Sequence, residues 1–165
     1  MKILFLCGRE ASYPLNQFLI ESIRHFADLD VPFEHDSGRS ILRRSFFVLL
    51  QALPKIFLGN YDLVFVGFFG HFIMLPLEFT RRQKVIFHPF ISTYETLVED
   101  RQRYSSNSIP ARFAFWLDKK ACQIASHIVL DTEANIDHFS KTFRIPRSRF
   151  SKIYIGSDER IFFSR

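Results

Sequence analysis

Short apolar runs alternate with longer amphipathic stretches along the whole chain. The apolar runs predict strands at residues 2–7, 31–35, 63–66, 84–87, 127–130 and 152–155. Apolar residues spaced three and four apart predict helices at residues 16–26, 40–58, 72–82, 108–124 and 132–143. Strands that alternate with helices imply right-handed crossovers and a mostly parallel sheet. We therefore predict an α/β fold: one Rossmann-like domain, residues 1–165, with about six strands and helices on both faces.

The predicted helices carry recognisable start signals. Asn16, Ser108 and Thr132 are residue types that cap helices. The packing stripe predicted for the helix at residues 108–124 consists of Phe113, Trp116, Leu117, Ala121 and Ile124. Residues 92–108 are polar and predict an irregular loop.

Ligands of parallel sheets bind beyond the carboxyl ends of the strands. The segments predicted at that edge are residues 8–15, 67–71, 88–94, 131–132 and 156–158. The first of them contains only one glycine, Gly8, whereas a dinucleotide turn needs three, and no Walker lysine follows. Arg9 and Tyr13 instead suit a bulkier ligand that is reached by side chains. A structural loop with a solvated Arg9 fits these residues equally well.

His88 directly follows a predicted strand and precedes Pro89. An imidazole there could orient or polarise a hydroxyl near neutral pH, although histidines at strand ends are also often structural. Gly67 and Gly70 flank Phe68 and Phe69, so this segment either approaches a ligand or contributes to the core.

The long loop after His88 carries the charged residues Glu95, Glu99, Asp100, Arg101 and Arg103. These residues form either a solvated face or, as is common for long loops at this edge, part of a binding site. The remaining histidines show no paired spacing and no paired cysteines accompany them, so we expect no metal site. They are His25, His35, His71, His127 and His138.

The net charge of +5 suggests an acidic partner: nucleic acid, anionic lipid or a phosphorylated substrate. The basic residues are scattered and no nucleic-acid motif is present, so we expect no nucleic-acid binding. The helix at residues 40–58 is too interrupted to span a bilayer. It either packs on the sheet or lies peripherally on an anionic membrane. Two cysteines without a signal peptide favour the cytoplasm.

Three segments together resemble the amino-terminal domain of a GT-B glycosyltransferase of the retaining family-four type. The strongest likeness is DKKACQIASHIVLDTEANIDHFSKTFRIPRSRFSKIYIGSDERIF, residues 118–162. KVIFHPFISTYETLVEDR, residues 84–101, is similar to the family's fourth strand and the loop that follows it. KILFLCGREASYPLN, residues 2–16, is similar to the opening of the family.

The resemblance implies an enzyme that builds polysaccharide or glycolipid at the inner face of the cell membrane. This half would bind a sugar or lipid-linked acceptor, and a second half would bind the nucleotide-sugar donor. The donor half is expected to be absent, so the chain is expected to be inactive without that domain or a partner chain. No metal and no cofactor is implied in this half. A non-catalytic binding or assembly module, a split-transferase subunit and a nucleotide-binding switch domain are the alternatives.

The resemblance also implies roles for single residues. His88 is the catalytic candidate. The expected acceptor-binding residues are Gly8, Arg9, Tyr13, Gly70, His71, Asp100 and Arg101. The expected rim of the cleft between the two halves is Asp131, Thr132 and Gly156.

Overall fold

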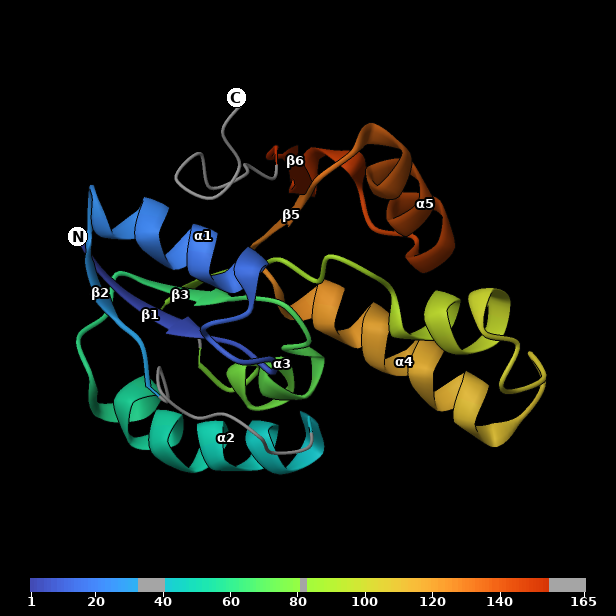
Figure 1. Cartoon of the computed structure of the whole chain (residues 1–165), viewed down its shortest axis with the longest axis horizontal. Helices are drawn as coiled ribbons and strands as arrows, with labels where there is room; N and C mark the ends of the chain where they lie inside the picture. The colour runs from blue at the N-terminus through green and yellow to red at the C-terminus, as the bar shows by residue number, and fades with distance from the viewer. Residues whose placement is uncertain (33–40, 81–82, 155–165) are drawn as a thin grey trace, which may run out of the picture.

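The computed structural model describes residues 1–32, 41–80 and 83–154, and within them it has one parallel sheet in the order β2-β1-β3-β4-β5-β6 (Figure 1). The strands are β1 (Lys2–Leu6), β2 (Asp28–Asp30), β3 (Leu63–Val66), β4 (Lys84–Phe87), β5 (His127–Leu130) and β6 (Phe150–Lys152). The helices are α1 (Pro14–Arg24), α2 (Ile41–Leu58), α3 (His71–Leu77), α4 (Ile109–Ile124) and α5 (Glu133–Phe143). A π-helix, η1 (Glu95–Asp100), and a 3-10 turn, η2 (Arg147–Arg149), complete the described elements. The predicted α/β class is confirmed.

Two cores lie on opposite faces of the sheet, because neighbouring side chains of a strand point to opposite sides. Helix α1 covers one face and packs Leu19 and Ile23 with Phe5 and Phe65, whose rings stack 5.3 Å apart. Helices α2, α3, α4 and α5 contribute to the second core. Figure 1 shows α1 on one side of β1 and β3, with α2 and α3 on the other. The prediction of helices on both faces is therefore confirmed.

The two outer strands begin earlier than predicted. β2 is residues 28–30 instead of 31–35, and residues 33–35 lie outside the described part of the chain. It pairs through its backbone with β1, and the side chain of Asp30 binds Lys55 and Tyr61. β6 is residues 150–152 instead of 152–155. An edge strand can be polar and needs no apolar run. Prediction from apolar content therefore placed both β2 and β6 at the wrong residues.

Helix α1 begins at Pro14 and not at Asn16, so the prediction of an Asn16 cap is wrong. Proline suits a first helical position because its missing N–H would have no partner there. The other two predicted caps are confirmed. Ser108 Oγ accepts a hydrogen bond from the Ala111 N–H at 3.4 Å. Thr132 Oγ1 accepts one from the Asn135 N–H at 3.1 Å.

The packing stripe predicted for α4 is wrong for its two large aromatic residues. Phe113 and Trp116 are about half exposed, at 49% and 47%. The buried residues of α4 are Ala111, Ala114, Leu117, Asp118, Ala121 and Cys122. Alanines let the helix lie close to its neighbours, and a charged residue, Asp118, shares this face. The aromatic residues are displaced to the outer face as a result.

Helix α2 has both a buried and an exposed apolar face. Val48, Ala52 and Ile56 are buried, while Phe46 and Phe57 are more than half exposed. The predicted start of this helix at residue 40 lies outside the described residues. Among the helices described, none has the length and apolar content needed to cross a membrane.

Candidate functional site

Backbone hydrogen bonds join the loops that follow β1, β3 and β4 at the carboxyl edge of the sheet. The Gly8 N–H donates to Phe68 O at 3.0 Å, and the His88 N–H donates to Val66 O at 2.8 Å. A Cβ on Gly8 would overlap the carbonyl oxygen of Phe69. Gly70 is enclosed in the same way by the side chain of Val66. Both glycines, predicted to bind an acceptor, therefore allow close packing within the chain itself.

Asn16 holds the first loop in place. It is fully buried. Its Nδ2 donates to Glu10 O at 2.9 Å, and its Oδ1 accepts from the Phe68 N–H at 3.3 Å. Buried amides retain their hydrogen bonds because an unpaired polar group in the core is costly. A single side chain thus fastens the loop after β1 to the loop after β3.

His88 lies fully buried between these loops. Neither ring nitrogen has a hydrogen-bond partner among the described residues. Burial lowers the pKa of His88 to about 4, and the charge of Asp131, at the end of the adjacent strand β5, opposes that shift. The ring is therefore neutral at pH 7 and has one lone pair that can accept a hydrogen bond. A buried polar group without a partner in the protein is rare, and its partner is usually an ordered water or a bound molecule.

Four aromatic side chains surround this part of the edge. Phe68 is the buried centre, with ring centroids 5.3 Å from Tyr13, 4.4 Å from Phe69 and 5.2 Å from Phe90. Phe90 also stacks on His88 at 6.3 Å. Phe69 and Phe90 have φ angles of 57° and 68°, in the left-handed region that bulky residues rarely adopt. Such strain persists only where the surrounding structure imposes it, and it clusters at functional sites.

Arg9 and Tyr13 extend the aromatic group outward. The Arg9 guanidinium lies 5.0 Å from the centre of the Tyr13 ring. Its Nε lies 3.3 Å from Glu10 Oε2. Both side chains are partly exposed, so this end of the edge offers charge and an apolar ring together.

His71 is buried inside the fold with Asp118, so the structure separates it from the exposed edge. Burial lowers the pKa of His71, and Asp118, whose Oδ1 lies 3.4 Å from His71 Nε2, opposes this effect. Asp118 Oδ2 accepts hydrogen bonds from Ser92 Oγ at 2.6 Å and from the Tyr94 N–H at 2.8 Å. One buried carboxylate therefore joins α3, α4 and the segment before η1. Prediction from the spacing of apolar residues did not identify Asp118, because it is a polar residue.

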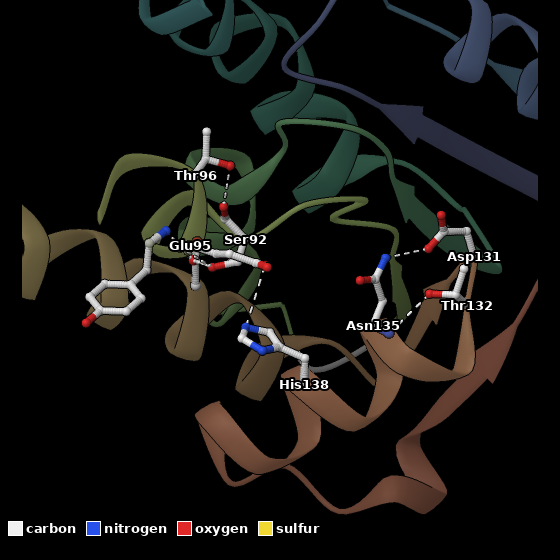
Figure 2. A network of polar contacts seen from close by, with 9 residues as sticks. Ser92, Glu95, Thr96, Asp131, Thr132, Asn135 and His138 are labelled. Carbon is white, nitrogen blue, oxygen red and sulfur yellow. Dashed lines mark hydrogen bonds and ion pairs between the residues drawn. The ribbon is translucent and has the colours of Figure 1, made fainter. Parts of the chain in front are cut away.

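The rim residues expected on β5 and α5 form a small network, shown in Figure 2. Asn135 Nδ2 donates to Asp131 Oδ1 at 2.6 Å, while Thr132 Oγ1 caps the helix. The structure brings Asp131 and His88 to the same edge. Gly156 lies outside the described residues. Asp100 and Arg101 are exposed at the end of η1.

A cluster that the sequence did not predict lies between η1 and α5. The carboxylates of Glu95 and Glu99 and the imidazole of His138 have donor atoms all within 4.8 Å of one another. These residues come from two segments about 40 positions apart, and no spacing motif links them. Figure 2 shows Glu95 pointing toward His138, which lies on the neighbouring helix.

Comparisons with known proteins support the fold. No protein-family model matches the sequence, and no curated protein matches it. A solved structure, that of HepE from Anabaena in complex with UDP, superposes with a TM-score of 0.54 at 16% identity. The match covers 98% of this chain and 46% of HepE, so the chain spans about half the length of that protein. The likeness establishes a Rossmann-like α/β fold, consistent with one half of a GT-B fold.

Proposed function

We propose that this chain is the acceptor-binding half of a glycosyltransferase of the retaining family-four type. It would present a polysaccharide or glycolipid acceptor to a nucleotide-sugar. The fold likeness to a protein crystallised with UDP supports the glycosyltransferase part of this proposal, because UDP is what remains of a UDP-sugar donor after transfer. The nucleotide-sugar would be held by a further domain or by a partner chain.

His88 carries the proposal. Because the ring is fully buried, an acceptor would have to displace side chains that cover it, among them Phe90, which stacks on it. The neutral, unpartnered ring would then accept a hydrogen bond from an acceptor hydroxyl and so orient the oxygen that attacks the donor sugar. The partly exposed rings of Tyr13, Phe69 and Phe90 supply an apolar wall on which a sugar ring or a lipid chain can pack. Asp131, at the adjacent strand end, would favour positive charge on the imidazole during the reaction.

The test is an NMR titration of the histidine ring nitrogens with a panel of disaccharides, a polyprenyl-diphosphate-linked sugar and UDP. We expect at least one sugar probe to shift the His88 signals, and we expect UDP to leave them unchanged. In the His88→Gln variant the binding should weaken, whereas His25→Gln, at an exposed histidine, should bind as before. UDP binding at these loops would refute the acceptor assignment and favour a nucleotide-binding domain. If no sugar probe binds, the proposal is also wrong.

Transfer itself gives a second readout. With a donor domain supplied as a separate chain, His88→Ala should lower sugar transfer about 100-fold, the smaller end of the usual contribution of a positioned acid or base. Asp100→Ala should lower it as well if η1 contacts the acceptor. Unchanged transfer in His88→Ala would remove His88 from the mechanism.

A peripheral membrane contact is part of the proposal, and the outer face of α2 supports it. Phe46, Leu50, Phe57 and Leu58 are each at least half exposed along this helix. Exposed apolar residues on one helix face can enter the interfacial region of a bilayer. Co-sedimentation with vesicles of anionic lipid should fall when Phe46 and Phe57 are replaced by serine. Equal sedimentation of both proteins would contradict the contact.

A non-catalytic assembly module is the second candidate, favoured by an apolar patch formed by Phe72, Phe113 and Trp116 on α3 and α4. The Phe113 ring lies 6.3 Å from Phe72 and 5.7 Å from Trp116. Such patches often mark protein interfaces. If analytical ultracentrifugation finds a dimer that Trp116→Glu converts to a monomer, the patch is an assembly surface. A monomer in both cases argues against self-assembly through it.

A further inference from the structure

We propose that Glu95, Glu99 and His138 form a binding site for a divalent transition-metal ion such as Zn²⁺ or Mn²⁺. The proposal stands independently of the glycosyltransferase function. It departs from the expectation from the sequence that no metal is bound. The donor atoms of all three side chains lie within 4.8 Å of one another, and two separate elements, η1 and α5, supply them.

The geometry of His138 is the first support. Its Nε2 is shielded from solvent and has no hydrogen-bond partner among the described residues. The nearest carboxylate oxygen, Glu95 Oε2, lies 3.6 Å away, which is beyond hydrogen-bond distance. The Nε2 lone pair of a neutral imidazole is a common metal ligand. Here it faces a carboxylate across a gap that a bound ion would fill (Figure 2).

The two glutamates are the second support. Glu95 and Glu99 lie four positions apart on η1, a six-residue π-helix. Like charges held this close repel each other. A cation between them turns this repulsion into attraction and neutralises both carboxylates. Because Glu99 is exposed and Glu95 is 42% exposed, small rotations of their side chains are free to occur.

The donor set indicates which ion fits. In a tetrahedral site with metal–ligand bonds of about 2.0–2.1 Å, neighbouring donor atoms lie about 3.3 Å apart. Glu95 Oε2 and His138 Nε2 already lie 3.6 Å apart, and all three donor atoms lie within 4.8 Å of one another. Closing the cluster around an ion therefore shortens no donor–donor distance by more than about 1.5 Å. One imidazole and two carboxylates suit zinc or manganese better than magnesium or calcium, which prefer oxygen ligands alone. Three protein ligands would leave a coordination position open for water or for an oxygen of a bound molecule.

A bound ion would join two parts of the chain that lie far apart in the sequence. Helix η1 belongs to the long segment after β4, whereas His138 lies on α5, beyond β5. The network of Asp131, Thr132 and Asn135 lies at the amino-terminal end of α5, about one turn before His138 (Figure 2). The ion would therefore fasten η1 to α5 beside the carboxyl edge of the sheet.

The experiment is a calorimetric titration of the full chain, freed of metal with a chelator, with Zn²⁺ and then with Mn²⁺. We expect one ion per chain for at least one metal, with a dissociation constant below about 100 µM. His138→Ala, Glu95→Gln and Glu99→Gln should each weaken binding at least tenfold, in line with the loss of a ligand. His25→Ala removes an exposed histidine elsewhere and should leave the titration unchanged.

Three outcomes would overturn the proposal. The first is that neither metal binds, which would leave Glu95 and His138 as an ion pair only. The second is binding that survives all three cluster substitutions, since the ion would then lie elsewhere. The third is weaker binding in His25→Ala to the same degree as in His138→Ala. Because these side chains are partly exposed, we expect each variant to fold. Circular dichroism of each variant checks this and so distinguishes a lost ligand from a lost fold.

Discussion

Acid should destabilise this protein through His88, because protonating that residue places a charge in a buried site. The pKa of the ring is lowered to about 4 by burial, against about 6.5 in an unfolded chain. Between these two values the unfolded state binds a proton that the folded state does not. Stability therefore rises with pH over this interval, is at its full value above about pH 6.5, and is lost as the pH falls toward about 4.

The size of the effect follows from the shift. A fall in pKa from 6.5 to about 4 is worth about 3.5 kcal/mol in full. About 3 kcal/mol of this is lost between pH 7 and pH 4, where the ring in the folded state is half protonated. This is a large share of the roughly 5–15 kcal/mol by which domains of this kind are stable. His71, whose pKa is also lowered by burial, adds a loss of the same sign.

Urea denaturation at half-unit pH steps from 4 to 7, followed by circular dichroism, measures the effect. The wild-type chain should lose about 3 kcal/mol more on acidification than the His88→Gln variant does. Protonation of carboxylates whose pKa is lowered, such as Asp30, also destabilises the folded protein in acid, but it does so equally in the wild type and in the variant. His25→Gln should follow the wild-type curve. Parallel curves for wild type and His88→Gln would refute the argument that His88 is buried in neutral form.

Two further predictions concern residues that hold the edge loops. Asp118→Ala should lower the free energy of unfolding by about 3 kcal/mol, because the Ser92 hydroxyl and the Tyr94 N–H lose their acceptor. Denaturant midpoints measure this, with Lys119→Ala as the neighbouring control, and a loss below about 1 kcal/mol would contradict it. Gly8→Ala should cost about 1–3 kcal/mol, since its Cβ would meet Phe69 O. Thermal denaturation measures this, with Ser12→Ala as an exposed control. If Gly8→Ala is as stable as Ser12→Ala, the prediction is wrong.

The buried strands of this fold could be predicted from the sequence. β3, β4 and β5 occur at the predicted residues because each contains at least three consecutive apolar residues in the middle of a sheet that is covered on both faces. The outer strands could not be predicted as well. β2 contains Asp28 and Asp30 and derives its place from backbone pairing with β1, a long-range interaction that hydrophobicity does not report.

The candidate site was only partly predictable for a similar reason. His88 could be recognised as a site residue because a parallel sheet places strand ends at one edge. Asn16 and Asp118 could not, since polar residues are expected at the surface and only tertiary partners make their burial favourable. The cluster of Glu95, Glu99 and His138 depends on how α5 lies beside η1, and no local pattern encodes that arrangement.

The strand order has a consequence for how the chain can fold during synthesis. β1 gains β2 on one side and β3 on the other, after which β4, β5 and β6 follow outward from β3 in chain order. Each described strand can thus join an open edge, and none has to be inserted between two strands that are already paired. Chains fold from the amino terminus as they leave the ribosome, so every new strand meets a template completed before it. A long-range, parallel topology that would otherwise fold slowly can in this way be assembled by successive additions of strands to an open edge of the sheet.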